Sequence, residues 1–174
     1  MNNNLKGLLF ISILLFLVPK ISSCQPEDTV FVASHHQTSN YDIAIFPDHY
    51  VLKAFNNRFT PTMEEVEQAE RALSRDLWRL NGAKMNQSRD KLIHTRLSRY
   101  KRQYFGYINK DEEKILLINA FYYKAPKYNK RVVWLNDIIE NVNGGSNYWN
   151  VKYNITKNRL FDLKVNSTLS QSKE

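Results

Sequence analysis

Residues 60–82, TPTMEEVEQAERALSRDLWRLNG, decide the fold class of this chain. Apolar residues recur within this stretch at steps of three and four positions. They are Val66, Ala69, Leu73, Leu77 and Leu80. This spacing places them along one side of an α-helix. The stretch therefore predicts an amphipathic helix that covers one face of another layer of secondary structure.

Both ends of the predicted helix carry signals of their own. Thr62 and Glu65 have the spacing of a capping box, with Thr60-Pro61 as an alternative start, and Asn81-Gly82 predicts a left-handed stop. Acidic residues crowd the first half and basic residues the second, which complements the helix dipole. These are Glu64, Glu65, Glu67 and Glu70, then Arg71, Arg75 and Arg79. We interpret the glutamates as solvated, because no histidine lies at a helical offset suited to a shared metal.

The hydrophobic pattern changes its period after residue 102. Residues 103–108 and 114–122 flank the polar residues 109–113, and together they predict a β-hairpin. Residues 115–118 are apolar in succession, which places the second strand in the middle of a sheet. We expect residues 131–139, RVVWLNDII, to form a third strand or the approach to one.

A second predicted hairpin lies near the end of the chain. Apolar and polar residues alternate in residues 149–155 and 161–165, which flank the polar residues 156–159. Such alternation predicts an antiparallel sheet with one face in water and one toward the helix. Residues 41–46 indicate a short strand, whereas residues 50–55 fit either a strand or a helical turn. The predicted class is α+β, with one amphipathic helix packed on an antiparallel sheet of about four strands.

This element order resembles that of cystatin-like domains. Residues 148–166 also look like the closing hairpin of PepSY-type modules in secreted bacterial proteins. The resemblance covers at most residues 60–166 and rests on element order and alternation. The inhibitory loop pattern of cystatins, glutamine-valine-x-valine-glycine, is missing. The resemblance therefore implies a fold but no activity.

The first 23 residues have the composition of a secretory leader. Lys6 precedes an apolar run from Leu8 to Val18. This run is too short to cross a bilayer as a helix, which takes about 20 residues. It fits the apolar region of a signal peptide, and Ser22-Ser23 offers a cleavage site.

Ile21-Ser22-Ser23-Cys24 follows this run and contains the only cysteine of the chain. The four residues resemble the lipobox of bacterial lipoprotein precursors, and the whole chain is similar to small uncharacterised lipoproteins of Bacteroidota. The resemblance implies a diacylglycerol on Cys24, removal of the leader before it, and no other cofactor. With Gln25 in the next position, it also implies an exported protein anchored to the outer membrane. An ordinary signal peptide followed by a free cysteine is the alternative.

We expect four parts along the chain. Residues 1–23 form the lipoprotein signal peptide, residues 24–40 a flexible tether, residues 41–166 a single α+β domain, and residues 167–174 a disordered tail. The adjacent histidines at residues 35–36 are interpreted as solvated. Side chains of neighbouring residues in an extended chain point in opposite directions and cannot share one metal ion.

The basic character of the chain is local. Without the leader, 23 basic and 17 acidic residues remain, and residues 84–102 hold seven of the basic ones beside one acid, Asp90. The seven are Lys84, Arg89, Lys91, Arg96, Arg99, Lys101 and Arg102. In a cytosolic protein they would suggest a nucleic-acid surface, but the leader argues against that partner. We expect either a surface that binds an anionic envelope lipid or glycan, or a solvated edge.

The sequence contains no phosphate-binding loop, no G-x-S-x-G elbow, no HExxH motif and no dinucleotide fingerprint. We therefore predict a lipid-anchored, non-catalytic binding or accessory module of the cell envelope, whose partner is an envelope protein or an anionic component. The alternative is an envelope enzyme around Asp48, His49 and His94, or a glycan-binding protein that uses Trp134 and Trp149. Either would have its site in the concave face of the sheet.

Overall fold

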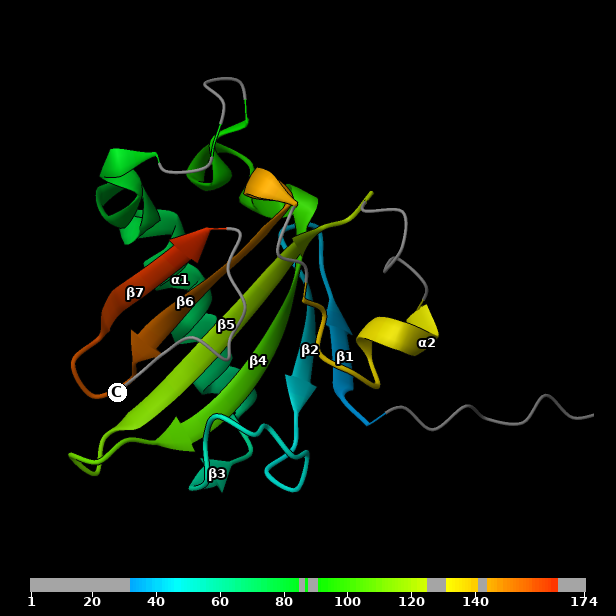
Figure 1. The fold of residues 1–174 in the computed structure, drawn as a ribbon, viewed down its shortest axis with the longest axis vertical. Helices are drawn as coiled ribbons and strands as arrows, with labels where there is room; N and C mark the ends of the chain where they lie inside the picture. The colour runs from blue at the N-terminus through cyan, green and yellow to red at the C-terminus, as the bar shows by residue number, and fades with distance from the viewer. Residues whose placement is uncertain (1–31, 85–86, 88–90, 125–130, 141–143, 166–174) are drawn as a thin grey trace, which may run out of the picture.

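The computed structural model describes residues 32–84, 87, 91–124, 131–140 and 144–165. Within these ranges, helix α1 (Met63–Leu80) packs on one mixed sheet, as Figure 1 shows. The strands are β1 (Ser34–Gln37), β2 (Asp42–Phe46), β3 (Arg58–Phe59), β4 (Tyr100–Ile108), β5 (Lys114–Tyr122), β6 (Tyr148–Asn154) and β7 (Arg159–Val165). The short helices are α2 (Arg131–Trp134), η1 (Asn81–Ala83), η3 (Ile93–Thr95), η4 (Leu97–Arg99) and η5 (Gly145–Asn147). The α+β class is confirmed.

The sheet contains seven strands in the order β1-β2-β4-β5-β6-β7, with β3 paired to β4. α1 is followed by the antiparallel strands β4–β7, which contain the two predicted hairpins. The strand number was underestimated, however, because β1, β2 and β3 extend the sheet. β2 and β4 run parallel, since the chain between them includes α1 and crosses from one end of the sheet to the other. The sheet is therefore mixed.

Residues 34–37, expected in a flexible tether, form the edge strand β1. They pair antiparallel with β2, and the backbone N–H of Ala33 donates to the carbonyl of Leu135 at 2.9 Å. The sequence of β1, SHHQ, has no apolar stripe, because an edge strand needs no buried face of its own. The described domain thus includes residues before the predicted start at residue 41.

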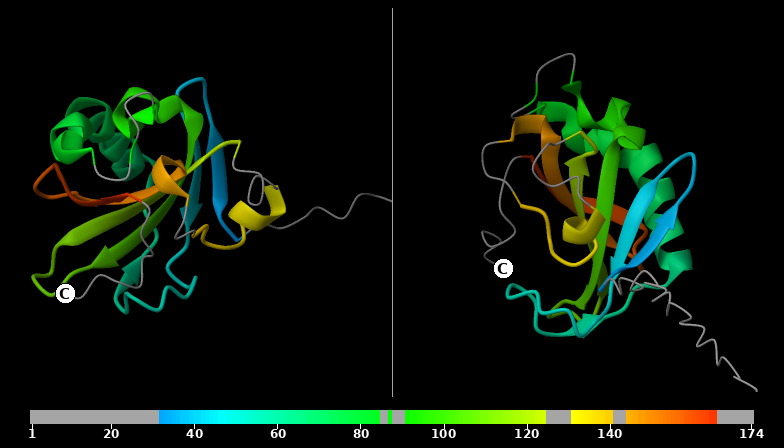
Figure 2. Two further views of the ribbon diagram at one scale, coloured as in Figure 1. Left: turned by 45° about the horizontal axis from the view of Figure 1, so that its top comes forward. Right: turned by 90° about the vertical axis from the view of Figure 1, so that its right-hand side faces the viewer.

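Both faces of the sheet are covered, so the expectation of one face in water was wrong. α1 buries one core, in which Leu73 and Leu77 meet Tyr104 of β4 and Trp149 of β6. A second core on the opposite face lies beneath Leu135. Figure 2 shows α1 and α2 on opposite sides of the sheet. The strand predicted at residues 131–139 is instead α2 and the loop after it, which make this second cover.

Two buried amides fix the segment that follows α2. Gln103 Nε2 donates to the carbonyls of Trp134 and Asp137, at 2.8 and 2.7 Å. Asn119 Nδ2, from the neighbouring strand, donates to the carbonyl of Ile139 at 2.8 Å. A buried segment outside helices and strands has no regular hydrogen-bond partners for its carbonyl groups. Leaving a buried carbonyl without a hydrogen bond lowers the stability of the fold. These amides supply the hydrogen bonds that a strand ladder would otherwise provide.

A β-bulge in β7 changes which residues face α1. The pairing with β6 slips between residues 150 and 152, and Asp162 takes a left-handed φ of 52°. Leu163 and Val165 consequently pack against the α1 core, whereas Phe161 packs against the other core. The prediction that Phe161, Leu163 and Val165 share one face was wrong, because strict alternation ends at a bulge.

Gly106 of β4 is a sensitive position because β3 lies directly on it. A Cβ at this residue would stand 2.5 Å from the carbonyl oxygen of Phe59 and 2.8 Å from its ring. Since a backbone oxygen cannot withdraw without disturbing the pairing of β3 with β4, Gly106→Ala should lower the free energy of unfolding by ~1–3 kcal/mol. Urea denaturation measures this change. Gly82→Ala is the matched control, because a Cβ there would meet nothing within 4 Å; equal effects of the two substitutions would contradict the close packing.

Candidate functional site

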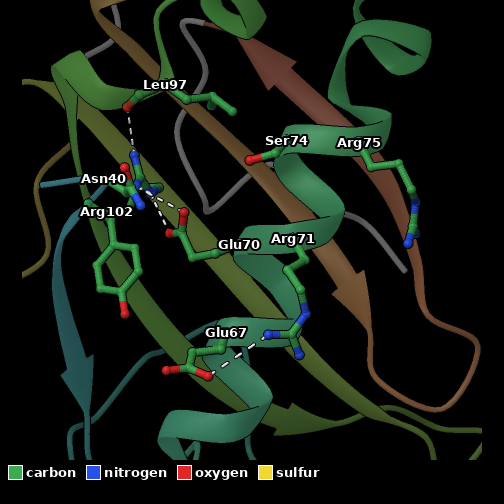
Figure 3. Close-up of a pocket in the computed structure, with 9 residues that line it drawn as sticks. Asn40, Glu67, Glu70, Arg71, Ser74, Arg75, Leu97 and Arg102 are labelled. Atoms are coloured by element: carbon green, nitrogen blue, oxygen red, sulfur yellow. Dashed lines mark hydrogen bonds and ion pairs between the residues drawn. The ribbon is translucent and has the colours of Figure 1, made fainter. Parts of the chain in front are cut away.

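A groove with a volume of about 580 Å³ lies between α1 and the margin of the sheet. We call it the α1 groove, and Figure 3 shows its residues. One wall belongs to α1 and consists of Glu67, Glu70, Arg71, Ser74 and Arg75. The remaining lining comes from the β1–β2 turn, η4 and β4, and consists of Asn40, Tyr41, Leu97 and Arg102. The volume falls in the range of ~300–1,000 Å³ typical of small-molecule sites.

The helical spacing of the lining residues explains why α1 provides one wall of the groove. Glu67, Glu70, Arg71 and Ser74 succeed one another at steps of three, one and three positions, so they share a side next to the buried stripe.

The capping box that starts the helix is confirmed, because Thr62 and Glu65 each bond the other's backbone N–H, at 3.2 and 2.9 Å. The predicted stop was wrong in detail. η1 continues the helix, and Lys84, with a φ of 49°, takes the left-handed position.

Arg102 forms the floor of the groove, and its side chain is 0% exposed. Its Nε donates to Glu70 Oε1 at 2.5 Å and its Nη2 to Glu70 Oε2 at 3.0 Å. Its Nη1 donates to the carbonyls of Leu97 and Tyr100, at 2.7 and 2.9 Å. Charged bidentate pairs of this kind are among the stronger hydrogen-bonded contacts in proteins. One guanidinium therefore joins α1, η4 and β4.

Tyr104 completes this buried cluster by donating its hydroxyl proton to Glu70 Oε1 at 2.5 Å. Burial alone would lower the pKa of Arg102, but the charge of Glu70 and its hydrogen bonds outweigh that effect and raise it. Burial, and then the negative charge of Glu70, raise the pKa of Tyr104 well above its ordinary value. At neutral pH the guanidinium is therefore charged and the phenol is a donor.

The predicted basic surface at residues 84–102 is broken up in the structure. Lys101 and Arg102 are consecutive in β4 and therefore point to opposite faces of the sheet. Arg102 is buried. The Lys101 ammonium lies 3.4 Å from a carboxylate oxygen of Asp42 and 4.6 Å from the centre of the Trp134 ring. Both cations are therefore bonded within the fold and do not belong to one open basic surface.

The other members of the predicted surface differ in exposure. Lys84, Lys91 and Arg99 are exposed, and Arg96 is half-buried. Arg89 lies outside the described residues, as does the predicted lipidation site, Cys24.

The rim of the groove carries arginines whose place in the helix predicted dipole and i,i+4 contacts but no binding site. The side chains of Arg71 and Arg75 are 65% and 54% exposed. Arg71 Nη1 lies 3.9 Å from Glu67 Oε2, and Arg75 Nη2 lies 2.6 Å from Asp76 Oδ2. Trp78, one turn further on, is 55% exposed. The helical spacing of Arg71, Arg75 and Trp78 could have indicated this rim from the sequence. A tryptophan on the polar side of an amphipathic helix is a second indication, because that side usually carries polar residues.

The catalytic grouping considered from the sequence does not form. Asp48 and His49 are exposed near the start of α1, where the backbone N–H of Asp48 donates to the Thr60 hydroxyl at 3.0 Å. His94 Nδ1 lies 2.8 Å from the amide nitrogen of Asn81, at the other end of the helix. A helix of 18 residues, about 27 Å long, lies between them.

The tryptophans considered for glycan stacking are both core residues, since Trp134 is 0% and Trp149 is 1% exposed. Within the described part of the chain, no group of three or more histidine, cysteine, aspartate or glutamate residues could hold a metal ion. Among the same residues, no helix has the length and apolarity needed to cross a bilayer.

The pair of Arg102 and Glu70 can be tested by a double-mutant cycle. Arg102→Met leaves the part-buried Glu70 carboxylate, whose side chain is 13% exposed, without its cation and should cost up to ~3–5 kcal/mol. Adding Glu70→Leu removes that charge, so the double variant should lose clearly less than the sum of the single losses. Urea denaturation of the four proteins gives the coupling energy. The exposed pair Arg71→Met with Glu67→Leu is the control, with a coupling of at most ~0.5 kcal/mol. Additive losses at Arg102 and Glu70 would refute a specific buried pair.

Two tyrosines, the buried Tyr100 and the partly buried Tyr50, make the stability fall in alkaline solution. Burial raises the pKa of Tyr50 and of Tyr100 to about 12, and a hydrogen bond to Asp137 contributes at Tyr50. An unfolded tyrosine loses its proton near pH 10. Between about pH 10 and 12 the folded protein therefore holds more protons than the unfolded chain, so the free energy of unfolding decreases as pH rises through this window.

Urea denaturation at several pH values, followed together with phenolate absorbance, checks this sign. Tyr50→Phe/Tyr100→Phe should show a shallower decline than the unmodified protein. A stability that stays constant from pH 9 to 12 would contradict the burial of these phenols.

The α1 groove therefore has a rigid floor, whose charged groups bond one another, beneath a rim of exposed arginine side chains. Such an arrangement can hold a ligand by hydrogen bonds and charge. Comparison with protein-family models, with curated proteins and with solved structures found no match.

Proposed function

We propose that this protein is a lipid-anchored protein of the cell envelope that binds a ligand in the α1 groove and catalyses no reaction. The lipid would be a diacylglycerol on Cys24, added as the leader of residues 1–23 is removed, and it would attach the protein to the outer membrane. The resemblance of Ile21-Ser22-Ser23-Cys24 to a lipobox supports this attachment. Several acyl chains together give the lasting anchorage that a single chain does not.

The division between the floor and the rim of the groove carries the binding role. Arg102 and Glu70 are hydrogen-bonded to each other and to neighbouring groups, so they hold a shape and are poorly placed to transfer protons. Arg71 and Arg75 lie at the rim with more than half of each side chain in solvent. Rigid support beneath exposed polar groups is the arrangement that favours binding.

The two covered faces of the sheet argue against the alternative sites. An enzyme or glycan site in a concave sheet face needs open space there, and α1 and residues 134–139 fill the two faces. The likeness of α1 and β4–β7 to cystatin-like or PepSY-type modules concerns element order alone. It brings no activity with it.

Metabolic labelling with a fatty-acid analogue tests the anchor. The full chain is expressed in a bacterium that processes lipoproteins, beside Cys24→Ala and the control Ser23→Ala, which keeps a small residue in the box. The unmodified chain and the control should take up label, and Cys24→Ala should take up none, because the thiol is the group that receives the diacylglycerol. An unlabelled wild-type chain, or equal label on Cys24→Ala, refutes the anchor.

A further inference from the structure

Three exposed residues of α1 extend the rim of the groove along the helix. Arg71, Arg75 and Trp78 stand at steps of four and three positions, so they form one stripe, which we call the α1 stripe. Trp78 Nε1 donates to the carbonyl of Arg75 at 3.0 Å, and the Arg79 guanidinium lies 5.3 Å from the centre of its ring. The indole is thus held in one orientation with its surface half in water. Tryptophan and arginine are the residue types that most often dominate binding energy.

The groove beside this stripe presents donors and acceptors close together. Glu67 and Arg71 face each other across 3.9 Å, which exceeds hydrogen-bond distance. A ligand hydroxyl placed near them could accept from the guanidinium and donate to the carboxylate at once. Ser74 and Asn40 add a hydroxyl and an amide from opposite sides of the groove. Such a mixture suits a ligand that carries several hydroxyl groups.

The surroundings of the stripe are positively charged. Arg71, Arg75 and Arg79 project from the second half of α1, and Asp76 is the acid placed among them, at 2.6 Å from Arg75 and 3.6 Å from Arg79. The chain after the helix adds the exposed Lys84. These four cations outnumber the neighbouring carboxylates of Glu67 and Asp76, and a net positive charge at the mouth of a groove attracts ligands of the opposite charge.

We propose that the α1 groove and the α1 stripe bind an acidic saccharide, a sugar that carries carboxylate or phosphate groups. Arg71 and Arg75 bind the anionic group through the guanidinium N–H groups that do not face Glu67 or Asp76, because guanidinium groups match carboxylate and phosphate geometry. Glu67, Ser74 and Asn40 hydrogen-bond the hydroxyls, and Trp78 packs against the apolar face of a sugar ring. The assignment rests on the proposed binding role and names the ligand class for that groove.

Isothermal titration calorimetry of the full chain, purified in detergent, tests this assignment. The probes are a hexamer of galacturonic acid, glucose 6-phosphate, a neutral galactose hexamer and vesicles of phosphatidylglycerol. We expect at least one acidic sugar to bind, at least tenfold more tightly than the neutral hexamer, and more weakly as salt increases. Arg71→Gln/Arg75→Gln should weaken that binding at least tenfold and Trp78→Ala several-fold. Arg159→Gln, an exposed cation on β7, is the control and should leave affinity unchanged.

Three outcomes would overturn the assignment: no binding of either acidic sugar, equal affinity for the neutral hexamer, or unchanged affinity in Arg71→Gln/Arg75→Gln. Binding to the vesicles alone that is lost in Arg71→Gln/Arg75→Gln would assign the surface to lipid and overturn it too. Urea denaturation of each variant shows whether it has folded. Labelling of Cys24 is independent of these side chains, so a labelled protein that binds neither acidic sugar refutes the ligand class alone. An unlabelled protein that binds one refutes the anchor alone.

Discussion

The ion pair between the buried Arg102 and the part-buried Glu70 is the contact on which the rest of this structure depends. A guanidinium with no exposed surface needs a nearby counter-charge, because burying it alone would be far too costly. Both carboxylate oxygens of Glu70 accept hydrogen bonds from the guanidinium, at 2.5 and 3.0 Å. This contact requires one particular rotation of α1 about its own axis. The pair therefore sets how the helix sits on the sheet, and it also makes the floor of the α1 groove.

The next residue of β4 performs the same task on the other face. Gln103 follows Arg102 and, because side chains alternate along a strand, points away from α1. Its amide holds the carbonyls of Trp134 and Asp137, and Asn119 beside it holds Ile139. Two consecutive polar residues in a central strand thus fix one covering layer each. Burial of polar groups is tolerated here because each finds its hydrogen-bond partner.

Local patterns in the sequence predicted the parts of the fold that are set locally. Helix α1, its capping box at Thr62 and the two hairpins follow from periodicity and turn composition. Strand β1 and helix α2 escaped prediction because their order comes from distant partners, such as Leu135 for Ala33. The role of Arg102 was missed for the same reason, since Glu70 lies 32 residues earlier. The charges of residues 84–102 were counted along the chain. In a strand, however, side chains alternate between the two faces, so Lys101 and Arg102 lie on opposite sides of the sheet. The lipobox remains a prediction.

The central claim is that Arg102 is fixed and shielded beneath a groove whose other arginines are open to a ligand. Hydrogen exchange of arginine Nε–H protons, followed by NMR on the isotopically labelled full chain, tests it most directly. The Nε proton of Arg102 is bonded to Glu70 and out of contact with water, so it should exchange orders of magnitude more slowly than those of Arg71 and Arg79. Exchange of the Arg102 proton at the rate of these exposed arginines would contradict the account.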